Sequence, residues 1–536
     1  MNTKKFTLLA TALVASQAYS PWATAQNMID GVRFGSSDII GTARYRSMAG
    51  AFGALGGDPS AMSDNPAGLG IYRGTNVAAF TPHLGFTSTE TLGSEKATGK
   101  DNNFSMSNFS VVFSFLPEND YLVNFNVGFG IQRNQQVFRK MNSVIGNPSG
   151  SFGSFLYEQA NTYLDDYNMQ AAYLGTNEAW SDVNVPLLSL MGYESYALDV
   201  ADGDPDHVDN PIFDHTYQQS NLLERTRHDN YNISAGFNFG DQFYAGVTVR
   251  ITDFNSMVEH CFSEDSERDF SGDYITYDNR VETKGSGIGL NMGVIWKPTE
   301  AWRIGAAVHT PVWMDMTEFN DASMEAYNIM YENALHNDPQ AQNWSDYNDQ
   351  IEYTYSTPWE YQISTAYVFG TNAIASFEYD LTDFTSMRFG AANSSSWGDK
   401  AYYKDMNKTQ KGYLQKQHTF KAGLEYRVTP RVSLRAGYAY KSSPYKKDAL
   451  FSQVYGEDVS FLYRTATKPN YSTLDAQHFI TAGAGWRGKN WTIDLSCVSH
   501  STAEYYSPYP CDFADSDILD FNTHSLEWDL SFGYRF

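Results

Sequence analysis

The chain ends in Ser525-Leu526-Glu527-Trp528-Asp529-Leu530-Ser531-Phe532-Gly533-Tyr534-Arg535-Phe536. Every second residue of this stretch is apolar or aromatic, and the residues between them are polar, charged or glycine. A β-strand with one apolar face has this period of two. A strand that ends the chain in this way, on Phe536, is typical of the closing strand of a membrane β-barrel, which the barrel-assembly machinery engages. We therefore expect the protein to act at a membrane.

Residues 1–25 carry the pattern of a secretory signal peptide. The basic pair Lys4-Lys5 precedes an apolar run from Phe6 to Val14, and the small-x-small site Ala23-Thr24-Ala25 follows. The mature protein is expected to begin at Gln26. No later stretch reaches the ~18 consecutive apolar residues that a membrane-spanning helix needs. An exported soluble protein and an outer-membrane barrel are the classes that remain.

The composition favours the barrel. Aromatic residues make up 15% of the chain and charged residues only 18%, against about 25% charged residues in soluble domains. Removal of the signal peptide leaves 35 basic and 62 acidic residues, a net charge of −27. This charge argues against nucleic acid as a partner. Solvated surface loops and an acidic rim that collects cations both explain it, and the loops are the simpler explanation.

Segments with a period of two recur from residue 76 onward, which predicts an all-β protein. In one of them, Phe243, Ala245, Val247, Val249 and Ile251 alternate with more polar residues. Fourteen such segments are found, and an even number suits a closed antiparallel barrel of residues 76–536 in a bacterial outer membrane. They lie near 76–88, 102–116, 121–138, 228–239, 243–254, 274–296, 302–318, 351–369, 373–386, 412–428, 432–442, 474–487, 491–502 and 523–536.

The connections alternate between tight turns, such as Gly240-Asp241-Gln242, and long polar loops. In outer-membrane barrels the short turns face the periplasm, so both chain ends are predicted to be periplasmic. The longest loop, 139–227, contains apolar residues such as Phe155 and Leu188. These side chains are expected either to form a lid over the pore or to hold the loop together.

The same loop contains Asp202, Asp204, Asp206 and Asp209. Carboxylates at short spacing suit calcium, but the pattern is not that of an EF-hand, and a solvated loop is the simpler interpretation. The three cysteines, Cys261, Cys497 and Cys511, allow at most one disulfide, and the sequence does not indicate which pair forms it.

Residues 26–75 lack the alternation and contain short glycine-rich pieces, including Ala49-Gly50-Ala51-Phe52-Gly53. No βαβ context surrounds them, so a phosphate-binding loop is not supported. Glycine allows close backbone packing and positive φ angles. The segment is therefore predicted to form a small plug, or hatch, inside the barrel.

Two stretches of this segment, Ser47 to Asp58 and Ser60 to Leu69, resemble the FadL/TodX-type outer-membrane transporters of hydrophobic compounds, especially the branch found in Bacteroidetes-like bacteria. The resemblance implies a lumen plugged by an N-terminal hatch whose gating residues are Asn65, Pro66, Ala67 and Gly68. It also implies an inward kink in the third strand that opens the wall sideways. Gly128 and Gly130 are the candidates for that kink, since glycine in a strand can mark a bend.

Charged residues alternate onto the predicted inner faces of several strands, which a fatty chain would not favour. Most of them are expected to hold the hatch by ion pairs, because a buried charge needs a partner. Arg250, Arg303 and Arg435 are the candidates for pairing with the carboxylate of a fatty acid in the lumen.

The predicted function is passive, ligand-gated uptake of hydrophobic compounds such as long-chain fatty acids. The alternatives are a general porin, a surface adhesin or antigen, and uptake of another hydrophobic ligand such as haem. No Gly-x-Ser-x-Gly elbow occurs and the histidines are scattered, so no enzyme activity and no cofactor is expected.

Overall fold

The structure is a computed structural model of the 536-residue chain, and it describes residues 28–91, 96–118, 121–182, 184–209, 217–266, 273–392, 397–446, 471–509 and 518–536. The predicted signal peptide at residues 1–25 and Cys511 lie outside the described residues. No helix in the described ranges is long and apolar enough to cross a membrane.

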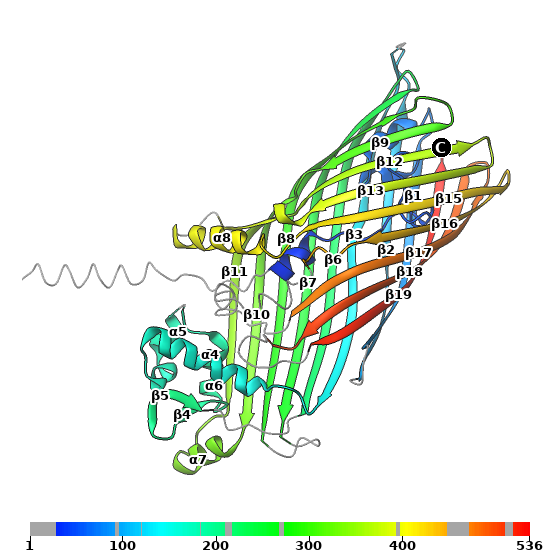
Figure 1. The fold of residues 1–536 in the computed structure, drawn as a ribbon. Coiled ribbons are helices and arrows are strands. Elements are labelled where there is room, and N and C mark those ends of the chain that lie inside the picture. The colour runs from blue at the N-terminus through cyan, green and yellow to red at the C-terminus, as the bar shows by residue number, and fades with distance from the viewer. Residues whose placement is uncertain are drawn as a thin grey trace, which may run out of the picture.

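One antiparallel sheet forms the wall (Figure 1). It contains seventeen strand pieces, and three wall positions hold two pieces each, β9 with β10, β11 with β12, and β13 with β14. The strand β1 pairs with β19 and closes the sheet into a barrel. The predicted fourteen-stranded barrel is therefore confirmed. The pieces are β1 (Val77–Thr91), β2 (Lys96–Phe115), β3 (Leu122–Gly146), β6 (Tyr217–Phe239), β7 (Phe243–Asp265), β8 (Tyr274–Trp296), β9 (Trp302–His309), β10 (Trp313–Tyr327), β11 (Trp344–Ser356), β12 (Trp359–Phe369), β13 (Ala373–Asp383), β14 (Arg388–Ala391), β15 (Lys416–Thr429), β16 (Val432–Lys441), β17 (Tyr471–Arg487), β18 (Trp491–Ser507) and β19 (Leu519–Arg535).

The membrane-facing surface follows from the side-chain alternation of the strands. On β7, Val247 and Ile251 point outward and are exposed, but beyond Ile251 the apolar side chains change face. Phe254 and Phe262 point inward and are buried, whereas Asp253 points outward. The reversal marks the place where the outer face meets water instead of lipid.

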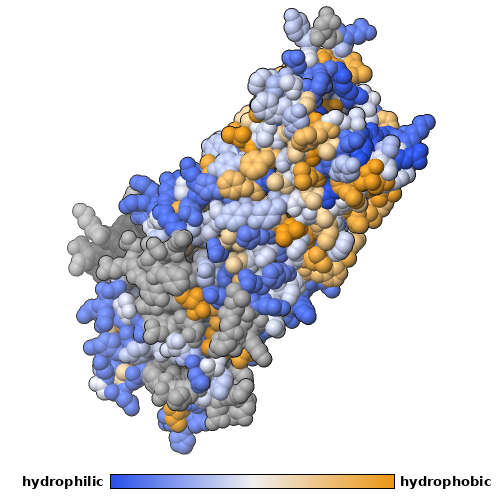
Figure 2. All heavy atoms as spheres, turned by 45° about the vertical axis from the view of Figure 1, so that its right-hand side comes forward, coloured by the Kyte–Doolittle hydropathy of each residue, from blue (hydrophilic) through white to orange (hydrophobic). Residues whose placement is uncertain are grey.

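Neighbouring strands reverse at the same level. Tyr231, Ile251, Ile288 and Trp313 are paired residue by residue across β6, β7, β8 and β10, and all four are exposed. We call these four residues the boundary row, because polar residues such as Asp253 and Ser286 follow them on the outer face. Figure 2 shows hydrophobic residues gathered on one half of the barrel between hydrophilic ends.

The longest predicted loop is shorter than 139–227. β3 continues to Gly146 and β6 begins at Tyr217, so both strands extend well above the boundary row. Apolar side chains such as Met141, Ile145 and Leu222 face inward in this extension, and a pattern sought with apolar residues outside does not find it. The residues between the two strands form a small helical insertion, which lies at one end of the molecule in Figure 1. It contains α4 (Phe152–Tyr167), η3 (Ala171–Gly175), α5 (Asn177–Ser181), α6 (Leu187–Glu194), β4 (Asp199–Ala201) and β5 (Asp204–Asp209).

The apolar residues of this insertion hold it together, which is one of the two roles left open by the sequence, and the lid over the pore stays a prediction. Phe155 and Leu188 pack in the insertion's own core. The same cluster includes Phe262, Tyr277 and Met324, which face inward from β7, β8 and β10. The insertion is therefore held together and also packed against the inner side of the extended wall. Two further helices, α7 (Ile329–Asn337) and α8 (Trp397–Gln410), lie between wall strands in the sequence.

The described part of the N-terminal segment lies within the barrel (Figure 1). It contains α2 (Met28–Gly35), α3 (Ala43–Arg46), η1 (Pro59–Met62) and η2 (Pro66–Ile71). Its glycines allow close backbone contact. Gly56 has a φ of +57°, and a Cβ atom there would lie 2.6 Å from the Cα atom of Gly68.

Candidate functional site: the lumen and its N-terminal segment

Asn65 joins the N-terminal segment to the wall. Its side-chain oxygen accepts a hydrogen bond from the Ala67 amide at 3.1 Å, which caps η2. Its side-chain nitrogen donates to the carbonyl oxygen of Gly53 at 2.7 Å and lies 3.3 and 3.4 Å from the carbonyl oxygens of Val294 and Ala306. The side chain is thus at once a helix cap and a contact with β8 and β9.

The wall has glycines opposite this turn. A Cβ atom at Gly293 would lie 2.0 Å from the Asn65 oxygen, and one at Gly246 would lie 2.2 Å from the Pro66 carbonyl carbon. Ala67 and Gly68 are also buried. The four predicted gating residues therefore form one tight contact with the wall, and gating by them remains a proposal.

Arg46 provides a second attachment. It is only 2% exposed, and its guanidinium forms ion pairs with Glu527 and Asp529 of β19. His83 lies 2.9 Å from Asp529 on the other side. The inward charges of the closing strand thus hold the N-terminal segment, in agreement with the structural interpretation of these charges.

Two of the three predicted arginine candidates are engaged. Arg435 donates to Glu425 at 2.8 Å and to Asp494 at 2.7 Å. Arg303 donates to the carbonyl oxygen of Leu55 in the N-terminal segment at 2.6 Å. Both side chains therefore have structural partners.

Arg250 differs from the other two. Its NH2 group lies 3.3 Å from the Thr310 carbonyl oxygen, and its Nε atom is buried without a partner among the described residues. No carboxylate oxygen of the described residues lies within 4.0 Å of a side-chain nitrogen of Arg250. The side chain lines a cavity in the lumen, and Arg250 is the predicted candidate that has room for a ligand anion.

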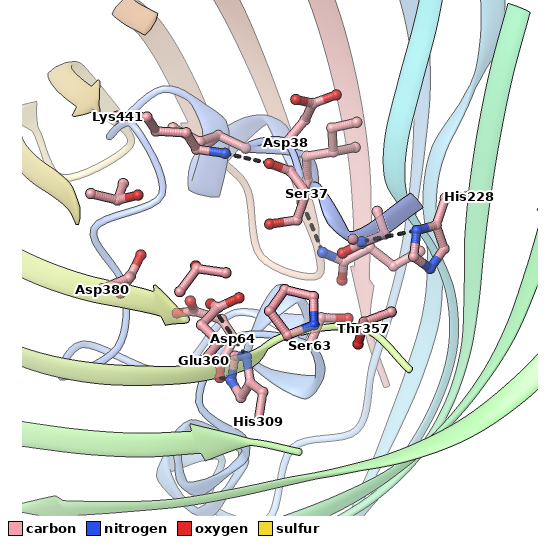
Figure 3. Close-up of a pocket in the computed structure, with 18 of the residues that line it drawn as sticks. Ser37, Asp38, Ser63, Asp64, His228, His309, Thr357, Glu360, Asp380 and Lys441 are labelled. Atoms are coloured by element: carbon pink, nitrogen blue, oxygen red, sulfur yellow. Dashed lines mark hydrogen bonds and ion pairs between the residues drawn. The ribbon is translucent and has the colours of Figure 1, made fainter. Parts of the chain in front are cut away.

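That cavity, the polar cavity, has a volume of about 90 Å³ and is bordered by the N-terminal segment and the wall (Figure 3). His309 Nε2 lies 2.6 Å from the Asp64 carbonyl oxygen, and its Nδ1 lies 3.4 Å from Glu360. Lys441 donates to the Ser37 carbonyl oxygen. Figure 3 shows Lys441 directed toward Ser37 on one side of the cavity and His309 beside Glu360 on another.

A second cavity of about 150 Å³ lies on the other side of the Ser37–Asp38 stretch, whose residues border both cavities. It is bordered by α2 and by residues 135–139 of β3. Arg139 there pairs with Glu224 at 2.7 Å and with Glu504. The second cavity therefore extends from the N-terminal segment to the wall at β3.

The ladder between β2 and β3 is interrupted beside this second cavity. Residues 108–115 of β2 pair with 125–132 of β3, and pairing resumes only at Thr98 with Asn142. The register between β3 and β6 also shifts between Arg133 and Gln135. Residues 99–107 and 133–141 thus have no ladder pairing with one another.

The interruption does not lie at Gly128 and Gly130. Gly128 pairs with Val112 and Gly130 with Ser110 in the regular part of the ladder. A Cβ atom at either glycine would lie within 2.8 Å of the Met62 side chain. These glycines provide space for the N-terminal segment, and the interruption lies further along β3, whereas the inward kink stays a prediction.

Side chains and the N-terminal segment occupy the interruption. Gln136 donates to Asn103 at 2.7 Å and accepts from Ser105 at 2.9 Å. On the inner side, the amide of Asp38 donates to the carbonyl oxygen of Asn134 at 2.8 Å. Side-chain hydrogen bonds and a backbone contact with the N-terminal segment replace the ladder bonds there. A change in the N-terminal segment would therefore alter the contacts at the interruption.

An apolar cluster surrounds α2 in the extracellular half of the lumen. The ring centroid of Phe34 lies 5.0 Å from that of Phe254 and 5.7 Å from that of Tyr355. We call this group the Phe34 cluster, and its buried members are Val32, Phe34, Phe254, Val312, Met314, Met316, Ile351, Tyr353, Tyr355, Phe384, Met387, Phe389, Tyr403, Met406, Leu414 and Tyr445. The sequence analysis missed it, although the inward alternation of Met314 with Met316 and Tyr353 with Tyr355 was a signal.

The predicted calcium ligands do not converge. Asp202 lies in the turn between β4 and β5, Asp204 lies 2.8 Å from His207, and Asp206 accepts from Gln170 at 3.2 Å. Within the described ranges no three His, Cys, Asp or Glu residues could hold a metal ion. Cys261 and Cys497 are both free thiols.

A closed barrel with an apolar belt, a lumen that contains the N-terminal segment and an interrupted wall ladder together define the architecture of an outer-membrane β-barrel. A family model described as outer membrane protein transport protein (OMPP1/FadL/TodX) matches residues 225–454. The resemblance to the FadL/TodX family is thereby confirmed. The family consists of transport proteins, in agreement with the prediction that the chain is not an enzyme, and fold and family place the protein in a Gram-negative outer membrane.

Solved structures share the architecture. A Pseudomonas aeruginosa FadL homologue is 13% identical with a TM-score of 0.51, over 94% of this chain and 99% of that chain. The Ralstonia pickettii toluene transporter TbuX is 14% identical with a TM-score of 0.48, over 93% and 99%. The P. putida toluene transporter TodX is 12% identical with a TM-score of 0.49, over 94% and 99%. At these identities the first likeness shows the fold alone. No curated protein is significantly similar in sequence.

Proposed function

We propose that the protein is an outer-membrane channel for the passive uptake of hydrophobic compounds. The observation that carries this proposal is the Phe34 cluster, an apolar site inside the lumen, which the protein fills with its own N-terminal helix. A hydrophobic molecule gains about 0.8 kcal/mol for each methylene that it buries. Such a molecule could therefore replace Phe34 among these side chains.

Ligand gating would follow from this replacement. The stretch that follows α2 contains Asp38, whose amide binds Asn134 at the interrupted ladder. A ligand shifts a conformational equilibrium only if it prefers one of the two states. A compound that binds where Phe34 lies in this structure would prefer the state with α2 displaced, and that displacement would loosen the contacts at the interruption. Release sideways into the bilayer is then proposed to occur between β2 and β3.

Long-chain fatty acids are the proposed substrates, and Arg250 is the proposed partner of their carboxylate. Arg250 and Phe254 both face the lumen on β7, four residues apart, which is about 13 Å along a strand. Val312 belongs both to the lining of the polar cavity and to the Phe34 cluster. A fatty acid with its carboxylate at Arg250 could therefore extend its chain into the cluster. The TodX and TbuX proteins are named as toluene transporters, and toluene would use the cluster alone.

The test compares the two substrates in one variant. Uptake of oleate and of toluene would be measured in proteoliposomes with the wild type, Arg250→Gln and the control Arg427→Gln, whose arginine is exposed. Hydrogen bonds to charged groups contribute about 1.5–3 kcal/mol, so R250Q should reduce oleate uptake about tenfold or more and leave toluene uptake unchanged. Equal losses for both substrates would contradict the role of Arg250. Wild-type uptake no faster than that of empty vesicles would contradict the proposed function.

A general porin is the second candidate, and the filled lumen argues against it. Three side chains connect the N-terminal segment with the wall, and they are Asn65, Arg46 and Arg303. An ion channel would need this segment to leave. Ion conductance of the wild type in planar bilayers would decide the matter, since a freely conducting protein would support the porin.

A further inference from the structure

A groove lined by five basic side chains lies between α8 and β14, and it shares Phe389 and Tyr403 with the Phe34 cluster. It has a volume of about 870 Å³, part of it open to solvent. Its basic residues are Arg388, Lys400, Lys404, Lys408 and Lys411, and its other lining residues are Phe389, Gly390, Ala391, Tyr403 and Asn407. Among the residues that the structure describes, no carboxylate lines the groove.

The position of α8 is fixed by its contacts with the edge of the sheet. The Asn407 side chain donates to the Phe389 carbonyl oxygen at 2.7 Å and accepts from the Phe389 amide at 2.9 Å. Tyr403 and Met406 are buried in the Phe34 cluster. The helix is therefore docked through one face, and the geometry of the groove does not depend on flexible side chains alone.

The lysines follow the docked face along the helix. Lys400, Lys404 and Lys408 are spaced by four residues and therefore lie on one side of α8, and Lys411 follows in the turn directly after the helix. All four side chains are exposed. Like charges at this spacing destabilise a helix. Asn407 and Tyr403 anchor the helix in spite of this repulsion. The positive charge therefore does not contribute to the folding of α8 and needs another explanation.

These cations form no ion pairs with carboxylates of the described part of the chain, although Asp383 interacts electrostatically with Arg388. None of the five forms an ion pair with a described carboxylate within 4.0 Å. The Arg388 guanidinium donates to the Thr385 carbonyl oxygen at 2.8 Å, which orients it without neutralising its charge. The groove therefore concentrates uncompensated positive charge.

The groove lies at the height where lipid headgroups begin. Arg388 pairs with Ser356, and Ser356 pairs with Trp313 of the boundary row. Directly paired residues point to the same face of a sheet, so Arg388 points outward at the last apolar row. The four lysines extend from this level over about 16 Å of helix.

We propose that this groove binds the phosphate groups of an outer-leaflet lipid headgroup. Lysine ammonium groups bind phosphate as point charges. Five cations over this length exceed what one carboxylate would neutralise, and they suit a headgroup with more than one phosphate. The level of Arg388 selects a lipid over a free anion, because the headgroup of a bilayer lipid is held at that level.

The test uses the full-length protein in detergent and counts bound lipid by native mass spectrometry. The probes are diphosphorylated lipid A and the same lipid without its phosphates. The quadruple variant K400Q/K404Q/K408Q/K411Q should bind the phosphorylated lipid about tenfold or more weakly than wild type, because four ion pairs are lost. The control K100Q/K140Q/K416Q/K489Q removes four exposed lysines outside the groove, and it should bind like the wild type. Heat-modifiable gel migration checks that each variant is a folded barrel.

Each result decides the proposal. Weaker binding by the groove variant alone, and weak binding of the dephosphorylated lipid, would support it. Equal binding by wild type and groove variant, or complete displacement of the lipid by inorganic phosphate, would overturn the lipid assignment. The groove variant should still take up oleate. Loss of oleate uptake with unchanged lipid binding would indicate that the groove binds the transported substrate. That result would overturn the lipid proposal whether or not the proposed function holds.

Discussion

One amide side chain, that of Asn65, connects three parts of the molecule. It caps η2, binds the carbonyl oxygen of Gly53 and contacts strands β8 and β9. The side chain is only 1% exposed. Its removal would leave backbone groups without partners at the place where the N-terminal segment meets the wall, and buried polar groups without partners are costly.

Asn65→Ala should therefore loosen the N-terminal segment and leave the barrel folded. Loss of a helix cap costs about 0.5–2 kcal/mol. This loss destabilises the N-terminal segment and not the barrel, because the wall strands keep their ladder bonds. We expect higher ion conductance in planar bilayers and an unchanged shift in heat-modifiable gel migration. The control is Asn333→Ala, whose side chain is exposed on α7. Wild-type conductance and uptake by N65A would contradict a gating role.

At this scale the sequence indicated which residues matter but not their partners. The inward alternation identified Arg435 and Arg250 equally, because both follow the strand period. Only the structure shows that Arg435 lies between Glu425 and Asp494, whereas Arg250 has no such pair among the described residues. Partners from distant strands depend on register and shear, and neither can be derived from alternation alone.

Among the elements, α2 and β3 show where local patterns fail. α2 has eight residues, including Gly31, and an isolated helix of this length is not stable in water. It forms because Val32 and Phe34 pack in the Phe34 cluster. For β3, the glycines suggested a bend, but Gly128 and Gly130 make room for Met62 and the ladder is interrupted elsewhere.

A reversible cross-link over the interrupted ladder tests the proposed sideways exit. Asn103 and Gln136 form a hydrogen bond across it. In a background with Cys261, Cys497 and Cys511 replaced by serine, N103C/Q136C would be joined with a bifunctional thiol reagent that reduction removes. We expect the cross-link to abolish oleate uptake and reduction to restore it, because the two strands can no longer separate.

The matched control for this cross-link is N255C/K284C, which joins directly paired residues of β7 and β8 in an intact ladder above the boundary row. It should leave uptake unchanged. Full uptake by cross-linked N103C/Q136C would exclude this interruption as the exit. Loss of uptake in both pairs would indicate a general effect of the reagent.

For the whole molecule, the strand alternation determines both the barrel and its position in the membrane. The number of strands and the alternation of short and long connections could be predicted, because lipid requires an apolar outer face over a fixed height. The extension above the boundary row could not, since its apolar side chains, such as Phe254 and Phe262, face inward. A search for one reversal of face within a strand would have located both the extension and the membrane boundary.

This boundary gives a prediction from a pair of arginine substitutions on β7. Val247 lies midway along the outward apolar part of the strand, and Met257 lies above the boundary row on the same face. Arginine at the bilayer midplane costs about 2–4 kcal/mol, so Val247→Arg should lower the free energy of unfolding from vesicles by that amount. Met257→Arg should leave it nearly unchanged. Equal effects at the two positions would place the boundary elsewhere.

The contact between Asn407 and Phe389 has a consequence for life in a crowded membrane. β14 is a four-residue strand that pairs with β11, and its other side presents backbone groups that could recruit a strand from a neighbouring protein. The Asn407 amide donates to and accepts from that backbone as a partner strand would. A single side chain thus protects this edge from unwanted association, and its replacement by alanine would turn a solitary barrel into a candidate for edge-to-edge aggregation.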